Sequence, residues 1–317
     1  MKKKKFKVQI QLIISLITII TFLLFASQIF AAEKTIGVIM TGNIPYYNEM
    51  HSGFISKLRE EGYADKVNII IQKPYPDPIS WSNAVRKLVA ADVDLIVTYG
   101  APATLSAIRE GIRVPIVYSG VYEPIAKGIK SKNVTGISFR VPVSSLLRYL
   151  RGVTTISTLG VIYNEAEEDS VHQLMELIRL SEQYGFRVEK IKLKRLRDAD
   201  AILSNIKTDA LFITSSSLVN MASDSIIGAA KANGTPTGAL LTGNIDSGVI
   251  ITLSARPDKQ GEKAAVKAIR ILNGIPPERI HAESSRGTEL IFNMKEAKAM
   301  GLRLSMDLIT EATKIIK

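Results

Sequence analysis

From Lys34 onward, short apolar runs alternate with amphipathic stretches, and this alternation constrains the fold more than any other feature of the 317-residue chain. Strands that alternate with helical patterns are typical of βαβ units and a parallel sheet. Met50, Phe54 and Leu58, for example, recur every four residues on one helix face, and Gly62 follows as a C-cap. The spacing predicts strands at 35–40, 67–71, 95–98 and 114–118, and helices at 47–61, 80–91 and 103–109.

The same pattern begins again after Thr155. It predicts strands at 159–163, 187–193, 210–213, near Gly238 and at 249–253, and helices at 171–184, 199–206 and 219–233. Two successive βαβ series of about 120 residues each fit the usual domain size better than one large sheet does. The sequence therefore predicts an α/β protein with two Rossmann-like lobes, each a parallel sheet flanked by helices, over 33–152 and 153–254.

The N-terminal stretch has a different composition. Residues 1–7 are basic, 8–30 are apolar, and Ala31, Ala32 and Glu33 open the polar chain. This order is typical of a secretory signal peptide over 1–32, which places the remaining chain in the periplasm or elsewhere outside the cytoplasmic membrane. The apolar run is longer than a usual signal core, so retention of the leader as a membrane anchor remains an alternative.

Composition and motifs exclude several classes of function. The chain has no cysteine, which removes disulfides, thiol nucleophiles and thiolate metal sites. Its formal net charge of +11 is not clustered on one face with aromatic residues, so we expect no nucleic-acid partner. Nucleophile-elbow, phosphate-loop and dinucleotide motifs are missing, and the three histidines are scattered. We therefore expect no enzyme activity, no catalytic residue, no cofactor and no metal site.

The loops after the predicted strands are the places to search for a ligand, because open parallel sheets bind ligands beyond the carboxyl ends of their strands. These loops hold small, hydroxylated, aromatic and acidic residues, which suit a small polar molecule with an apolar or aromatic part. The candidate ligand-binding residues are Asn43, Tyr46, Tyr47, Tyr99, Gly100, Ala101, Ser119, Tyr122, Glu123, Asn164, Asp169, Ser215, Ser216, Asn244 and Asp246.

Each kind of candidate also has an alternative structural role. The tyrosines could stack on a ligand ring or ammonium group, or pack at strand ends. Glu123 could hold an ammonium group or be a surface acid. Ser215 and Ser216 precede a predicted helix, where they could cap it or bind a carboxylate. Trp81, the single tryptophan, is more typical of the core at its helix start.

Five segments carry a family resemblance, in this order along the chain: 121–128 (VYEPIAKG), 133–136 (NVTG), 159–164 (LGVIYN) with Ser170, 260–265 (QGEKAA) and 293–302 (NMKEAKAMGL). Together they resemble the periplasmic substrate-binding proteins of ABC transporters, in the family that includes tryptophan- and tyrosine-binding members. The resemblance implies a type I periplasmic-binding fold with a hinge of three crossings and a ligand between the lobes. It also implies that about 255–280 complete the N-terminal lobe and about 281–317 the C-terminal lobe.

The chain departs from the family pattern at four places near the expected ligand, one of which is the loop 242–244, which lacks the acidic residue often found there. Glu123 stands where the family usually has Asp, Asp169 where Asn is frequent, and 215–217 are serines where Asp is common. The loop contents favour an amino acid-like ligand with an aromatic or branched side chain, because the loops lack the Arg typical of sugar sites.

The expected function is the solute-binding component of an ABC transporter, a monomer that captures this small molecule and delivers it to a permease. The alternative is a membrane-anchored, bilobed sensor that reports the ligand to a signalling partner. A leader retained over 1–32 would favour the sensor.

Overall fold

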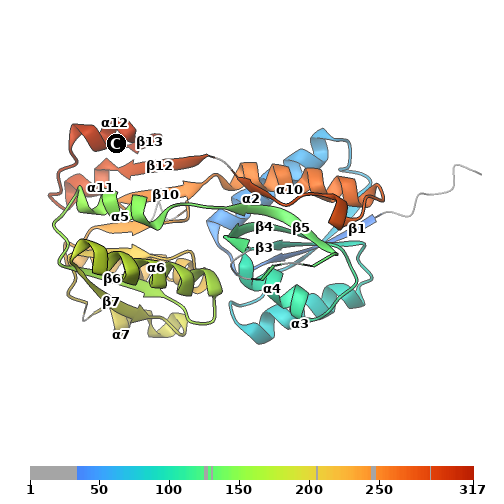
Figure 1. Ribbon diagram of the computed structural model, residues 1–317, viewed down its shortest axis with the longest axis horizontal. Coiled ribbons are helices and arrows are strands. Elements are labelled where there is room, and N and C mark those ends of the chain that lie inside the picture. Colours follow the sequence, from blue (N-terminus) through green and yellow to red (C-terminus); the bar gives the residue numbers. More distant parts are fainter. Residues whose placement is uncertain (1–33, 125–127, 130, 205, 244–247, 286) are drawn as a thin grey trace, which may run out of the picture. The chain divides into compact units, whose positions relative to one another are not determined.

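The computed structural model describes residues 34–317, except for 125–127, 130, 205, 244–247 and 286. Thr35–Lys317 forms one compact unit, whose strands make two sheets (Figure 1). The predicted signal peptide lies outside the described residues. Among the residues that are described, no helix combines the length and the apolar character needed to cross a bilayer.

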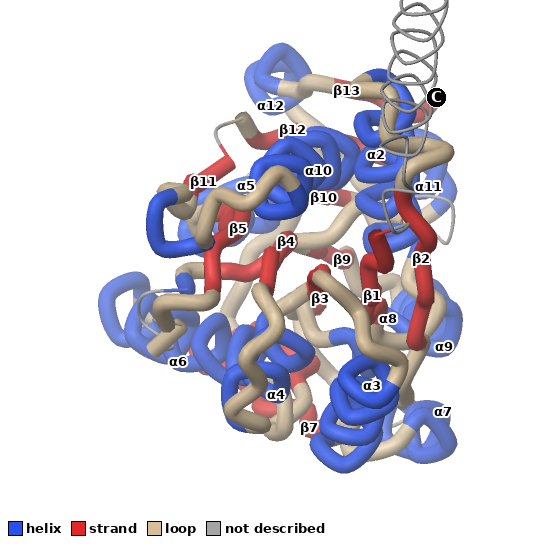
Figure 2. Tube along the Cα trace, turned by 90° about the vertical axis from the view of Figure 1, so that its right-hand side faces the viewer, coloured by secondary structure: helices blue, strands red, loops and turns tan. Residues whose placement is uncertain are grey.

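The first sheet has six strands in the order β11-β5-β4-β3-β1-β2. The pairings from β1 through β3, β4 and β5 to β11 are all parallel. Figure 2 shows α2 and α10 on one side of these strands and α3 and α4 on the other. The elements are β1 (Lys34–Met40), α2 (Pro45–Glu60), β2 (Val67–Gln72), α3 (Pro78–Ala90), β3 (Leu95–Tyr99), α4 (Ala101–Arg109), β4 (Ile116–Tyr122), β5 (Val134–Phe139), α10 (Pro257–Leu272) and β11 (Glu283–Ser285).

The second sheet has seven strands in the order β13-β12-β10-β9-β8-β6-β7. Residues of α5 and α6 join the core on one face, and residues of α7, α8 and α9 form a separate core on the other. The elements are α5 (Val143–Arg151), β6 (Thr158–Tyr163), α6 (Glu168–Tyr184), β7 (Arg187–Lys192), α7 (Ala199–Leu203), β8 (Ala210–Ile213), α8 (Ser217–Met221), α9 (Ser223–Ala232), β9 (Thr237–Ala239), β10 (Ile251–Ala255), β12 (Thr288–Asn293), α11 (Met294–Ala299), α12 (Met306–Glu311) and β13 (Lys314–Ile316).

The predicted two-sheet α/β fold is confirmed, with several local differences. Strand β4 extends to Tyr122, through residues expected in a loop, and the helix predicted over 199–206 ends at Leu203. The second sheet is mixed, because β10 pairs with β12 antiparallel. The chain leaves this sheet at the end of β10 and returns at the start of β12, so the two strands run in opposite directions. The helix predicted over 219–233 is two helices, α8 and α9, which meet at Ala222.

The chain passes between the sheets three times. The passages lie between β5 and α5, between β10 and α10, and between β11 and β12. Helix α5 contacts β9 and β10, so the first passage falls at 140–142. A division into two lobes that move separately stays a prediction.

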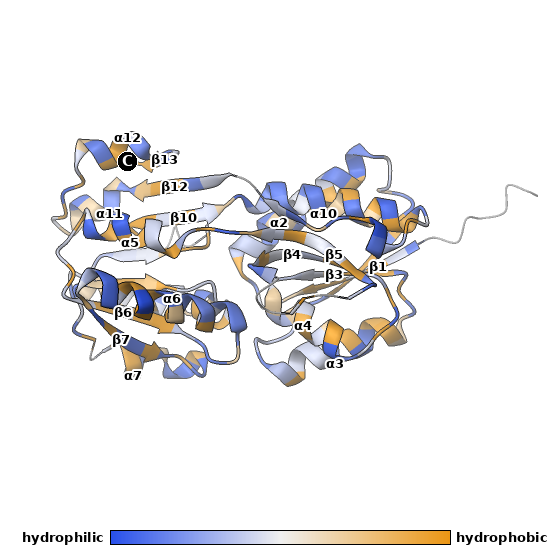
Figure 3. Cartoon of the chain, viewed as in Figure 1, coloured by the Kyte–Doolittle hydropathy of each residue, from blue (hydrophilic) through white to orange (hydrophobic). Residues whose placement is uncertain are grey.

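Apolar residues concentrate on the strands, as Figure 3 shows for β6. All five residues of β3 are buried, as expected for a central parallel strand with helices on both faces. Helices α2 and α10 approach so closely that a Cβ on Gly261 would clash with the backbone of Met50, and one on Gly53 with the backbone of Asp258. Glycine is therefore required at this helix crossing.

Candidate functional site

The residues that follow the strands of one sheet contact those that follow the strands of the other. Gly42 comes after β1, and a Cβ there would lie 2.5 Å from Sδ of Met221 in α8. Gly243 comes after β9, and a Cβ there would lie 2.6 Å from Cβ of Pro45, the first residue of α2. The carboxyl ends of both sheets thus meet, which is where ligands bind in open α/β sheets.

Two of the candidate tyrosines form a stacked pair at this junction. The rings of Tyr47 and Tyr99 are both buried, with centroids 6.3 Å apart and an interplanar angle of 23°. The Tyr99 hydroxyl lies 3.0 Å from Nδ1 of His51. Gly100 has a φ of 84° and lies against the Tyr47 hydroxyl, so a side chain at position 100 would be strained and would displace the ring.

The environment of Tyr47 brings both sheets together. Burial raises the pKa of Tyr47, the nearby Ser217 side chain lowers it, and the charges of Glu167 and Asp169 raise it further. Ser217 opens α8, and the two acids lie at the start of α6. Tyr47 therefore belongs to a buried polar cluster that elements of both sheets build.

Tyr46 serves a different purpose from its neighbour. Its buried hydroxyl donates to the carbonyl oxygen of Ala255 at 3.3 Å and accepts from Nε2 of Gln260 at 2.7 Å. Both partners flank the second passage between the sheets. The structure therefore places Tyr46 as a support of that passage.

Tyr122 and Glu123 lie at the end of β4, close to α6. The Tyr122 hydroxyl donates to Oε2 of Glu176 at 3.2 Å. Glu123 has a φ of 45°, and its carboxylate lies 2.8 Å from Nε of Arg140 and 3.4 Å from Nε2 of His172. The carboxylate predicted to hold a ligand ammonium group thus already has two basic partners.

A buried acid that the sequence analysis did not select, Glu167, caps α8. Its carboxylate accepts from the hydroxyl of Ser216 at 2.5 Å, from the backbone N–H of Ser217 at 2.6 Å and from that of Leu218 at 3.0 Å. Burial raises the pKa of Glu167, and these hydrogen bonds lower it. The helix end that Ser215 and Ser216 suggested for a ligand carboxylate is therefore occupied by a carboxylate of the chain itself.

Two further candidates are tied into loop structure. The Asn164 side chain donates to the carbonyl of Leu193 and accepts from the N–H of Ala166, both at 2.8 Å, and so shapes the loop after β6. Ser215 exchanges two hydrogen bonds with the buried amide of Gln173, at 2.7 and 2.8 Å.

Buried hydroxyls without a hydrogen-bond partner mark the remaining part of the junction. Within the described part of the chain, Oγ of Ser119 and Oγ1 of Thr242 have no partner, although the two residues are only 0% and 6% exposed. Ser119 lies in β4 and Thr242 follows β9, so each sheet contributes one. A buried polar group without a partner is unfavourable by about 1–3 kcal/mol. A polar ligand at this junction would relieve that cost.

The other candidates lie at the edge of this region or outside the description. Asn43 is exposed and accepts from Nδ2 of Asn48 at 3.1 Å. Ala101 is buried as the first residue of α4. Asn244 and Asp246 lie outside the described residues.

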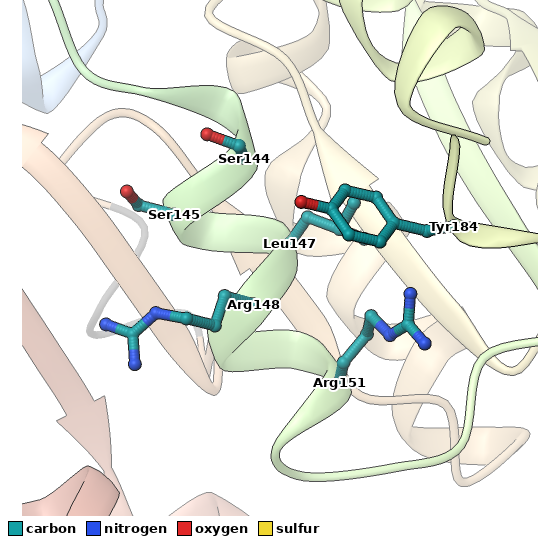
Figure 4. A pocket seen from close by; sticks show the side chains of 6 residues that line it. All are labelled: Ser144, Ser145, Leu147, Arg148, Arg151 and Tyr184. Carbon is teal, nitrogen blue, oxygen red and sulfur yellow. The ribbon is translucent and has the colours of Figure 1, made fainter. Parts of the chain in front are cut away.

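The described residues also line a cavity of about 470 Å³ away from this junction, between α5 and the end of α6 (Figure 4). In Figure 4, Arg151 and Tyr184 lie side by side, whereas Arg148 points away from them. Arg148 pairs with Glu311 at 2.6 Å. No candidate residue lines this cavity, and within the described residues no group of His, Asp or Glu could hold a metal ion.

Comparison with known proteins decides the family. Residues 35–316 match the family model described as ABC transporter substrate binding protein. The chain belongs to this family. Because the family consists of binding proteins, the substrate-binding protein described here is not an enzyme, and the family resemblance seen in the sequence is confirmed.

Relatives of this substrate-binding protein include a tyrosine-binding protein of Clostridioides difficile, 26% identical over 87% of this chain and 83% of the relative. Among solved structures, the ABC domain in complex with L-Trp from Streptococcus pneumonia superposes with a TM-score of 0.84, at 21% identity, over 90% of this chain and 100% of that one. A ligand-free, open substrate-binding protein with adhesive properties from Clostridium difficile gives a TM-score of 0.63, at 25% identity, over 90% and 99%.

Proposed function

We propose that this substrate-binding protein captures a small amino acid-like molecule with an aromatic or branched side chain between its two sheets and delivers it to an ABC permease. The observation that carries the proposal is the buried junction at which the stacked pair Tyr47 and Tyr99 lies near unpartnered hydroxyls from both sheets. A stacked aromatic pair suits an apolar side chain, and hydroxyls suit a carboxylate. Relatives named for tyrosine and L-Trp support this ligand class.

Asp169 is the proposed partner of the ligand ammonium group. Asp169 is buried, and its charge acts on both Tyr46 and Tyr47. Glu123, another acid considered, is only half-buried at the end of β4. A buried carboxylate close to the aromatic pair is the better partner, because a charge-assisted hydrogen bond is strongest where water is excluded.

The mechanism is closure of two lobes around the ligand. The chain superposes better on the L-Trp complex than on the open, ligand-free relative, with TM-scores of 0.84 and 0.63. This difference supports a closed arrangement of the two sheets. A ligand that touches both lobes only in the closed state shifts the population toward that state, which a permease then recognises.

The site of action follows from the family and the leader. A substrate-binding family of ABC transporters works outside the cytoplasm. The proposed signal peptide over 1–32 would export the chain there. The exported chain is proposed to be a monomer. N-terminal sequencing of the exported protein tests the removal of the leader. A mature chain that begins near Glu33 supports transport, whereas an intact leader supports the anchored sensor.

Calorimetry of the exported protein with L-Tyr, L-Trp and L-Leu tests the ligand class. Micromolar or tighter binding, about −8 kcal/mol or better, is expected for at least one of them. Asp169→Asn should weaken that binding at least tenfold, with Asp224→Asn, on α9, as the matched control. No binding of any amino acid, together with clear binding of a nucleoside or a sugar, would contradict the proposal.

A further inference from the structure

Helix α6 carries three half-buried polar side chains at a spacing of four residues: Glu168, His172 and Glu176. Residues four apart share one face of a helix, so the three form a row, here called the α6 stripe. Helix α6 packs on β6 and β7 of the seven-stranded sheet. The stripe is therefore fixed to that sheet.

Every member of the α6 stripe contacts a residue carried by the six-stranded sheet. Arg109, at the end of α4, donates from Nη2 to Oε1 of Glu168 at 2.7 Å. Tyr122, at the end of β4, donates to Glu176 at 3.2 Å.

Between these two contacts, Nε2 of His172 lies 3.4 Å from the Glu123 carboxylate, and its ring meets the Tyr122 ring edge-on at a centroid distance of 5.7 Å. Three consecutive turns of one helix thus bridge the two sheets.

The middle contact is also linked to the first passage between the sheets. Arg140, in that passage, holds the other carboxylate oxygen of Glu123 at 2.8 Å. Glu123 has a φ of 45°, a backbone conformation that a non-glycine residue keeps only where its surroundings hold it. Arg140 and His172 supply such a hold, each at one carboxylate oxygen of Glu123.

We propose that the α6 stripe stabilises the closed arrangement without any ligand and thereby sets the apparent ligand affinity. All of its partners are side chains of the protein, so these contacts form whenever the sheets approach. The inference rests on the proposed function, in which only the closed arrangement binds tightly. The apparent dissociation constant is the intrinsic one divided by the closed fraction, so a stripe that raises this fraction tightens binding.

The test measures closure in the absence of ligand. The chain has no cysteine, so Ala90→Cys on α3 and Ala201→Cys on α7 introduce spin labels at two exposed positions, one beside each sheet. Electron–electron double resonance on the exported protein then reports the distance between the sheets. The double variant Glu168→Ala with Glu176→Ala should move the unliganded population to longer distances.

The same double variant should weaken L-Tyr binding about fivefold, chiefly through faster dissociation. Glu182→Ala, on the same helix but outside the stripe, should change neither reading. A separate variant that exchanges the ionic partners, Arg109→Glu with Glu168→Arg, keeps Glu176 and should keep the short distance of the parent.

Unchanged distances in the double variant would overturn the inference, and so would an equal shift in Glu182→Ala. The distance readout does not need a bound ligand. A parent protein that binds no amino acid would therefore contradict the proposed function, while the distances would still decide whether the stripe closes the molecule.

Discussion

The hydroxyl of Ser216 donates to the carboxylate of Glu167 at 2.5 Å, across 49 residues of sequence. Ser216 also accepts from the N–H of Val219 at 3.1 Å. Its hydroxyl therefore caps α8 and at the same time binds Glu167, which caps the same helix. The start of α8 is thereby fixed against the start of α6. Ser217, the next residue, is consequently held beside Tyr47.

Glu167→Ala should destabilise the protein by about 3 kcal/mol, because two backbone N–H groups and a buried hydroxyl would lose their acceptor. Urea unfolding at pH 7 measures the loss. Glu165→Ala is the matched control. Glu165 lies two residues earlier and its side chain is exposed, so its replacement should lower the unfolding free energy much less. Equal losses would show that the buried cap is unimportant.

The pH dependence of stability should carry the signature of Glu167. Burial raises the pKa of Glu167 in the folded protein above the ordinary value of 4.5. The stabilisation that its protonated form adds to the unfolding free energy is therefore fully present below pH 4.5 and is lost as the pH rises through the folded pKa. Glu167→Gln should therefore flatten the fall in unfolding free energy above pH 4.5. A variant whose pH profile parallels that of the parent would contradict this assignment.

Ser119→Ala should affect stability and binding in opposite directions. Its buried hydroxyl has no partner among the described residues, so its removal should leave the unliganded protein equally stable or more stable. The same change should weaken amino acid binding about tenfold, since the ligand would lose a hydrogen bond of about 1.4 kcal/mol. Calorimetry and thermal unfolding measure the two effects.

Ser138→Ala provides the contrast, because the Ser138 hydroxyl in neighbouring β5 donates to the carbonyl of Glu283 at 3.1 Å. It should lose stability and keep its affinity. If the Ser119→Ala protein binds the amino acid as tightly as the parent, the Ser119 hydroxyl does not contact the ligand.

Gly261→Ala should destabilise the fold by several kcal/mol, because the new Cβ would enter the backbone of α2 at Met50. Gly228→Ala, within α9, meets nothing within 4 Å and should stabilise the helix by about 0.5–1 kcal/mol. Thermal unfolding of the pair checks both signs. A tolerated Gly261→Ala would mean that α2 and α10 can move apart.

Much of the architecture follows from local pattern. Strands such as β3 and β6 are continuous apolar runs, and glycines such as Gly185, with a φ of 69°, end the helices as expected. The order of strands in a sheet and the antiparallel pairing of β10 with β12 depend on contacts distant in sequence. Periodicity alone does not encode such contacts.

The site was only partly predictable for the same reason. Tyr47, Tyr99 and Ser119 were expected near one another because carboxyl ends of parallel strands share an edge, and they do lie at one junction, although Tyr47 lies in α2 and Ser119 within β4. Glu167 was missed because an acid among other acids in a loop is expected to be exposed to solvent. Only the fold shows that residues distant in sequence bury it. No local signal separated Tyr46, which supports a passage, from its neighbour Tyr47.

The third passage is a short tether. Ser285 pairs with Phe139 at the edge of one sheet, and Thr288 pairs with Ala255 in the other. Three Cα–Cα steps separate Ser285 from Thr288, so these points can never be more than about 11 Å apart. Because Phe139 and Ala255 begin the other two passages, all three leave the sheets from neighbouring strand ends. The proposed closure would therefore be a swing about one narrow line, because these connections do not let the two halves separate in translation.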